Sequence, residues 1–194
     1  MAITLTKGQQ ISLEKTGGGA LSVVRMGLGW QAAPRKGLLA RLTGPAEVDL
    51  DASAVLFAGR EPVDVVFFQH LVSEDGAVRH TGDNLVGGAG QGGDDEAILV
   101  DLARLPAHVD QIVFTVNSFT GQTFADVRNA FCRLIDETDG QELARYTLSG
   151  GGAYTAQIMA KVHRAGGNWH MSAIGEPAQG RTFQDLLPAV AAHL

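Results

Sequence analysis

The chain has 194 residues, a length typical of one domain, so a single domain spanning residues 1–194 is expected. Hydrophobic residues make up 45% and charged residues 19%, which excludes intrinsic disorder, and no apolar run reaches the ~20 residues of a membrane-spanning helix. The net charge is −6, but the stretch from Pro45 to Asp110 holds thirteen acidic and three basic residues, which argues against nucleic acid as a partner.

Short strands dominate the predicted elements. Alternating apolar and polar residues predict strands at 3–6, 10–14, 21–26, 52–57, 63–69, 96–102, 111–118, 130–135, 142–148, 156–163 and 169–174. Helix is expected as two turns in TFADVRNA (123–130) and as a C-terminal helix from Thr182, disturbed by Pro188. So little helix cannot supply βαβ crossovers. We therefore predict a mostly β fold, an antiparallel β-sandwich with a short internal helix and a C-terminal helix.

Two Asp-Gly pairs and one Gly-Gly pair mark the expected hairpins. Asp75-Gly76 separates VVFFQHLV from AVRHT, Asp139-Gly140 separates FCRLIDE from ELARYTL, and RAGGN (164–168) joins two further strands. The sequence GLGWQA (27–32) imitates a dinucleotide-binding fingerprint, but Pro34 and Gly37 exclude the helix that such a site requires.

The remaining chemistry-bearing side chains predict structural roles. Cys132 lies in the apolar stretch NAFCRLI and is expected to be a buried, unreactive thiol, and Trp30 and Trp169 are expected in the core. A single cysteine excludes a disulfide framework, and no secretory signal is visible at the start. These features predict a cytoplasmic protein, with contact at the inner membrane face as a further expectation.

The acidic third of the chain holds the strongest candidate site. Asp49 and Asp51 lie two residues apart and share one face of an extended chain. Further oxygen donors follow in HTGDNLVGGAGQGGDDE: Asp83, Asn84, Asp94, Asp95 and Glu96. Six converging carboxylates would repel strongly without a counterion. Hard oxygen donors and close backbone carbonyls favour Ca²⁺, with Mg²⁺ second and Zn²⁺ a poor match, and two ions would balance the charge better than one. The alternative is that these acidic runs are solvated turns.

Several motifs together resemble the tellurium-resistance TerD family. They include TLTKGQQISL, VRMGLGW, VDLDASAVLF, GDNL, GGDDE, NAFCRLIDETDGQELARYTL and GGNWHMSAIGE, in family order over residues 1–175. The resemblance implies a calcium-binding β-sandwich involved in tellurite resistance and stress response, without enzymatic activity. Its implied calcium ligands are Asp49, Asp51, Asp83, Asn84, Asp94, Asp95 and Glu96, with help from glycine-loop carbonyls such as that of Gly87. Gln31 departs from the family, which usually has an acidic residue there.

Three functions are weighed on this basis. The leading hypothesis is a non-enzymatic Ca²⁺-binding protein, with two ions, that contacts related TerD-family proteins or a membrane-associated stress complex. The alternative is a metal-dependent hydrolase acting on phosphorylated or other anionic substrates, for which His80 is the nearby candidate base. A third hypothesis is an interaction module in which the basic residues Arg35, Lys36 and Arg41 bind an acidic partner.

Overall fold

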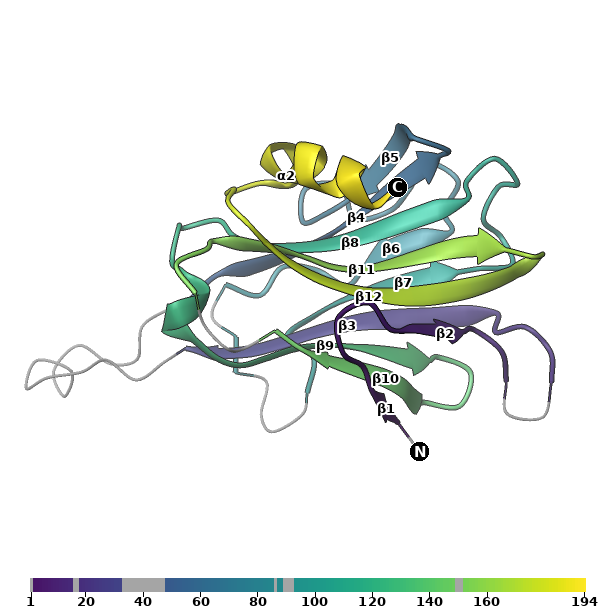
Figure 1. Cartoon of the computed structure of the whole chain (residues 1–194), viewed down its shortest axis with the longest axis horizontal. Coiled ribbons are helices and arrows are strands. Elements are labelled where there is room, and N and C mark those ends of the chain that lie inside the picture. Colours follow the sequence, from purple (N-terminus) through teal and green to yellow (C-terminus); the bar gives the residue numbers. More distant parts are fainter. Residues whose placement is uncertain (1, 16–17, 33–47, 86, 89–92, 149–151) are drawn as a thin grey trace, which may run out of the picture.

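The computed structural model describes residues 2–15, 18–32, 48–85, 87–88, 93–148 and 152–194, which form two stacked sheets (Figure 1). The strands within these residues are β1 (Ile3–Thr4), β2 (Gln10–Ser12), β3 (Val23–Ala32), β4 (Leu50–Ala58), β5 (Glu61–Val66), β6 (Val78–His80), β7 (Glu96–Asp101), β8 (Gln111–Ser118), β9 (Val127–Asp136), β10 (Gln141–Thr147), β11 (Ala156–Ala165) and β12 (Asn168–Ala178). The mostly β sandwich predicted from the sequence is confirmed.

Each layer is a six-stranded sheet. The first sheet has the order β1-β10-β9-β3-β7-β6, and the second has the order β2-β12-β11-β8-β4-β5. Every pairing between these strands is antiparallel except that of β1 with β10, which is parallel. Because β1 and β2 lie at the edges of different sheets, the N-terminal segment links the two layers along one side of the sandwich.

The second sheet is buried on both faces at β4. Leu50 and Leu56 pack into the core between the sheets, whereas Val55 and Phe57 face the other way into a second apolar cluster. That second cluster includes Leu186 and Val190 of the helix α2 (Phe183–Val190), which lies on the outer side of this sheet (Figure 1). Covering by α2 explains why β4 has no solvent-facing side along most of its length.

The C-terminal helix forms as predicted. Asp185 accepts hydrogen bonds from the backbone N–H groups of Arg181 (2.9 Å) and Thr182 (3.1 Å), which satisfies donors at the helix start. Pro188 lies inside the helix, and a 3₁₀ turn, η2 (Ala191–His193), follows it.

The prediction of a two-turn helix in TFADVRNA is wrong. Only the 3₁₀ turn η1 (Phe124–Asp126) forms, and β9 already begins at Val127. Phe124 is fully buried and stacks on Tyr154 with ring centroids 5.1 Å apart, while the following residues pair with β3. Pairing along a whole strand outweighs the weak helical preference of so short a segment.

The hairpin predicted at Asp75-Gly76 forms, but it is shorter than the predicted strand 63–69 implies. A tight turn does form, with Gly76 at φ +71° and Ser73 bonded to Val78, and Val72 bridges Arg79. The strand before the turn is not the partner, because β5 ends at Val66 in the second sheet, whereas β6 belongs to the first. The chain crosses between the layers before the turn, since the N–H of His80 already donates to the carbonyl of Leu71. The hairpins at Asp139-Gly140 and at residues 164–168 are confirmed by the β9–β10 and β11–β12 pairings.

The strand predicted to end at Met26 instead continues through GLGWQA to Ala32. Up to Ala32, where the described segment ends, the glycines lie within a strand and do not start a helix, which agrees with the rejection of a dinucleotide site. Trp30 and Trp169 are buried in the core, as predicted. Cys132 is fully buried as well, and burial raises the pKa of its thiol to about 12.

Candidate metal centre

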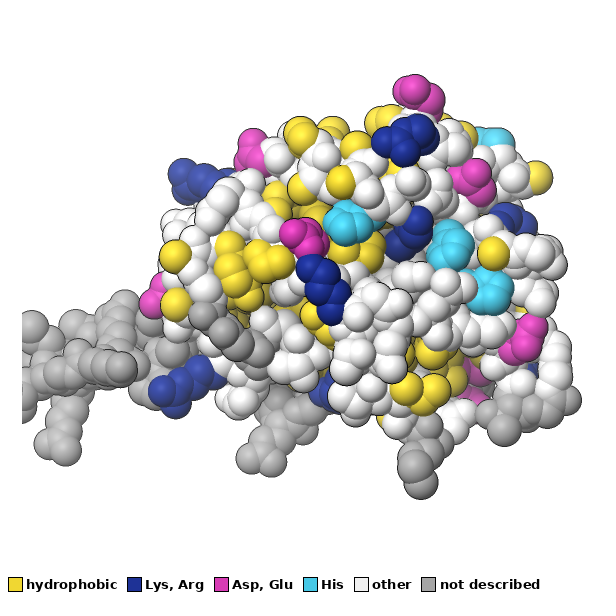
Figure 2. All heavy atoms as spheres, viewed as in Figure 1, with side chains coloured by type: hydrophobic (Ala, Val, Ile, Leu, Met, Phe, Trp, Pro, Cys, Tyr) yellow, Lys and Arg dark blue, Asp and Glu magenta, His cyan; other side chains and the backbone are white. Residues whose placement is uncertain are grey.

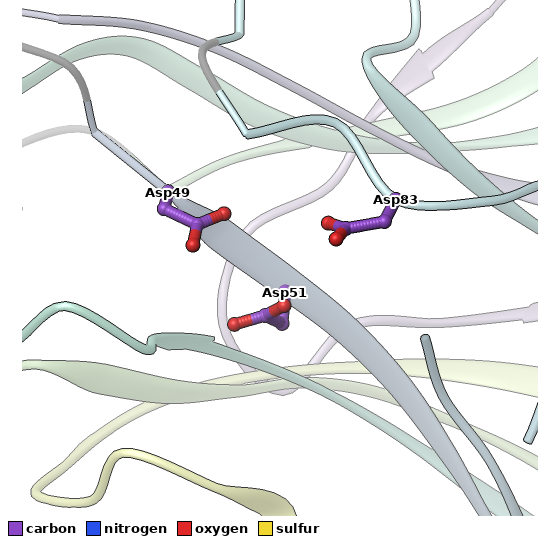
Figure 3. Close-up of side chains that lie close together, drawn as sticks. All are labelled: Asp49, Asp51 and Asp83. Carbon is purple, nitrogen blue, oxygen red and sulfur yellow. The ribbon is translucent and has the colours of Figure 1, made fainter. Parts of the chain in front are cut away.

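Three aspartates from two segments meet at one point. Asp49 and Asp51 lie at the start of β4, and Asp83 lies in the segment after β6. Figure 3 shows the Asp83 side chain reaching from its own segment toward the other two carboxylates. One oxygen from each carboxylate can be chosen so that all three lie within 4.8 Å of one another.

This spacing fits one calcium ion. Calcium–oxygen distances are about 2.3–2.6 Å, so two ligands of one ion lie up to about 4.6–5.2 Å apart. Asp49 Oδ1 is buried and accepts no hydrogen bond from any described residue, an arrangement that is costly unless a cation or water fills the gap. Both the spacing and this unpaired oxygen favour a cation among the three carboxylates.

The pKa values of Asp49 and Asp51 are raised, so their ionised forms are disfavoured in the absence of a cation. Burial, followed by the charges of Asp83 and Glu96, raises the pKa of Asp49 to about 6. Burial, followed by the charges of Asp49, Glu96 and Asp83, raises the pKa of Asp51 to about 8. A bound cation would remove the repulsion that contributes to these shifts.

Glu96 connects the two segments that carry the clustered aspartates. It is 1% exposed and lies at the start of β7, in the first sheet. Its Oε2 accepts the N–H of Ala52 (2.8 Å), next to Asp51, and its Oε1 accepts the N–H of Asn84 (3.1 Å), next to Asp83. One carboxylate thus connects β4 of the second sheet to the segment after β6.

His80 packs against Glu96. Its side chain is fully buried, and its Nδ1 accepts the N–H of Gly82 at 3.0 Å, which places the ring proton on Nε2. Nε2 lies 3.4 Å from Glu96 Oε2. This position leaves His80 without access to solvent or to a substrate.

Trp30 and Asp95 form a second support. Asp95 accepts the backbone N–H of Trp30 at 2.8 Å and the side-chain amide of Asn84 at 3.3 Å. The Trp30 indole N–H donates to the carbonyl of Val48 at 2.7 Å, just before Asp49. Gly87, at φ +65°, lies so close to this indole that a Cβ there would meet its Nε1 at 2.4 Å. Trp30 therefore fixes both the entry to β4 and the glycine loop.

Asp94 lies apart from the cluster in the described structure. It accepts a hydrogen bond from Arg133 Nε at 2.6 Å and lies 3.4 Å from Arg25 Nη1. Its carboxylate sits over Gly27, where a Cβ would approach to 2.3 Å. The predicted ligand set thus divides into the three aspartates, the supporting groups of Asn84, Asp95 and Glu96, and the arginine-paired Asp94.

Two supporting residues, Asn117 and Trp30, were not predicted as part of the site. Asn117 lies opposite Asp51 in the β4–β8 pairing, and its Nδ2 donates to Asp51 Oδ2 at 3.3 Å. The available signal was the polar Asn117 at the end of the apolar stretch IVFTV. Trp30 was predicted only as a core residue. Arg35, Lys36 and Arg41 lie outside the described residues.

Comparison with known proteins places the chain among stress-related sequences. A sequence model of the TerD domain matches residues 1–189. Among similar proteins, the tellurium resistance protein TerZ of Serratia marcescens is 47% identical over 95% of this chain and 94% of its own length. General stress protein 16U of Bacillus subtilis is 40% identical over 93% of both chains.

A solved structure shares the fold. A homologue of the telluride resistance protein TerD from Streptomyces coelicolor superposes with a TM-score of 0.71 at 20% identity, covering 89% of this chain and 98% of that one. No helix among the described residues combines the length and apolar character needed to cross a bilayer.

Proposed function

Since the chain belongs to the TerD domain family, we propose that it is a non-enzymatic Ca²⁺-binding protein of tellurite resistance and stress response. The observation that carries the calcium proposal is the cluster of Asp49, Asp51 and Asp83, with one buried oxygen left unpaired. Carboxylates are the ligands that calcium prefers, and the described cluster contains no nitrogen or sulfur ligand of the kind that zinc prefers.

A bound ion would connect the two layers of the sandwich. Asp51 belongs to β4 of the second sheet and Asp49 directly precedes that strand, whereas Asp83 follows β6 of the first. The ion would therefore link the two sheets, as the hydrogen bonds of Glu96 to Ala52 and Asn84 also do. We propose a structural and regulatory role for calcium, with binding coupled to the stability of the whole domain.

The burial of His80 argues against its role as the general base of a hydrolase. His80 is fully buried, with its Nδ1 bonded to the N–H of Gly82 and its Nε2 3.4 Å from Glu96 Oε2. General-base catalysis requires a group within reach of the substrate proton. Contact with related proteins or a membrane-associated complex, and a cytoplasmic location, remain predictions.

Calorimetric titration with Ca²⁺ tests the proposal. We expect saturable binding that is lost in Asp49→Asn and Asp83→Asn, whereas Glu74→Gln, an exposed acidic residue of the same acidic third, retains it. No heat of binding in the unmodified protein, together with no calcium found by metal analysis, would contradict it.

The number of ions is a separate question. A second ion would need Asp94 to leave Arg133 and Arg25, and it would draw on loop residues outside the described structure. Asp94→Asn distinguishes the cases. A fall from two ions to one supports the two-ion prediction, and an unchanged stoichiometry of one ion contradicts it.

A further inference from the structure

A cavity of about 100 Å³ lies beside the aspartate cluster, between the outer face of the second sheet and the start of α2. Asp51 lines it and so belongs to both the cluster and the cavity. Four phenylalanines from three segments also line it: Phe67, Phe68, Phe119 and Phe183.

The four rings form a continuous row. Ring centroids lie 5.0 Å apart for Phe67 and Phe183, 5.6 Å for Phe67 and Phe68, and 5.9 Å for Phe68 and Phe119. Phe119 is 43% exposed, although large apolar side chains are usually covered. The ring at this end of the row is therefore accessible to a ligand.

The size of the cavity restricts its occupant. One water needs roughly 10–15 Å³ by this measure, and pockets for drug-sized ligands are roughly 300–1,000 Å³. About 100 Å³ lies between these limits. The cavity suits a group the size of a single side chain.

Two buried acceptors that line the cavity favour a cation able to donate N–H groups. Asp51 is 4% exposed, and Asn117, 2% exposed, has an Oδ1 that accepts no hydrogen bond from any described residue. Arg181, the basic residue among those lining the cavity, has its Nε bonded to the Phe119 carbonyl at 2.9 Å. The face of the molecule seen in Figure 2 shows basic and acidic side chains interspersed.

We propose that this cavity binds an organic cation of side-chain size, an ammonium or guanidinium group on a short apolar stem. The phenylalanine rings contact the stem and attract the positive charge through their π faces, and the Asp51 carboxylate pairs with it. An anion would be repelled by the carboxylates, and a neutral apolar group would leave Asp51 facing an apolar neighbour. The proposal shares Asp51 with the proposed calcium site but does not require calcium.

Nuclear magnetic resonance titration, followed through the phenylalanine ring signals, tests the proposal. The probes are n-butylammonium and methylguanidinium, with 1-butanol as the neutral isostere and butyrate as the anion. We expect saturable shifts with both cations and about tenfold or more weaker binding of butanol and butyrate. No saturable shift with either cation, or equal binding of butanol, would overturn the proposal.

Variants and calcium separate this proposal from that of the metal site. Phe119→Leu keeps apolar volume but removes a ring, so cation binding should weaken several-fold while calcium affinity stays unchanged. Leu85→Ala, a 60% exposed apolar residue that does not line the cavity, should change neither. Full cation affinity in Phe119→Leu would contradict the proposal.

Titrations run with calcium and with chelator show which proposal fails. Cation binding in chelator without any calcium binding would support the cavity and reject the metal site. A capped lysine peptide that binds more tightly than butylammonium identifies a partner's side chain as the source, and equal affinity identifies a free amine.

Discussion

Burial and neighbouring carboxylates disfavour the ionised form of Asp51, which is the form that binds a metal. The side chain is 4% exposed and neighbours other carboxylates, so its pKa is raised to about 8. Neutralising it should relieve repulsion in the absence of metal while removing a ligand. The two effects therefore act in opposite directions on stability, depending on calcium.

We predict that Asp51→Asn stabilises the calcium-free protein at pH 8, by on the order of 1 kcal/mol, and abolishes stabilisation by calcium. Equilibrium unfolding in chelator and in saturating calcium measures both effects. Glu74→Gln is the matched control, because it removes one charge from an exposed position. A calcium response of unmodified size in Asp51→Asn would show that Asp51 is not a ligand.

The pH dependence of the calcium-free protein follows from the same residues. The pKa values of Asp49 and Asp51 rise from 3.8 to about 6 and about 8 on folding, so the folded state holds protons more tightly than the unfolded chain. The contribution of these two groups to stability should therefore be fully present below about pH 4 and be lost as the pH rises through 6 and 8. Unfolding in chelator at pH 5 and pH 8 measures the slope, and Asp51→Asn should flatten it. A slope that is unchanged in this variant would contradict the assignment.

Residue spacing predicted part of the site and missed the rest for a physical reason. Asp49 and Asp51 share a face because alternate residues of a strand do, and the sequence shows this directly. Asp94 looked equivalent to them, but Arg133 and Arg25, far away in the chain, pair with it. Such long-range ion pairs leave no local signal.

At the scale of elements, β3 controls the geometry of the cluster. Its glycines leave space for Asp94 and for the Phe131 ring, and Trp30 bonds to the residue before Asp49. The metal centre thus depends on a strand that contributes none of the three clustered carboxylates.

We predict that Trp30→Phe lowers both stability and calcium affinity. The variant keeps an aromatic ring but loses the 2.7 Å hydrogen bond to Val48, worth about 1 kcal/mol, and loosens the entry to β4. Trp169→Phe is the control, because Trp169 is also buried in the core but has no role at the cluster. It should lose stability alone. Calorimetry and unfolding measure the two effects, and equal calcium affinities in the two variants would contradict the role of Trp30.

Alternation and turn residues predicted most strands and the C-terminal helix, but not which strands are neighbours. Both the Asp139-Gly140 turn and the Asp75-Gly76 turn join paired segments, but β5, the strand before the second turn, pairs in the other sheet. Local chemistry sets the turn in both cases. The partner of each strand is decided by core packing, which no short segment encodes. The same reason explains why TFADVRNA contributes to a strand.

For the molecule as a whole, the net charge of −6 has a structural meaning. Its acidic residues are concentrated in one third of the chain, and three of them meet where the two sheets approach. Calcium bound there would connect the layers and reduce the repulsion between the carboxylates. Binding should therefore stabilise the entire sandwich rather than one loop.

The free energy of unfolding, measured in saturating calcium and in chelator, tests this account most directly. At a calcium concentration 100 times the dissociation constant, we predict an increase of about 2.7 kcal/mol, absent in Asp83→Asn. Equal unfolding free energies in calcium and in chelator would contradict the account.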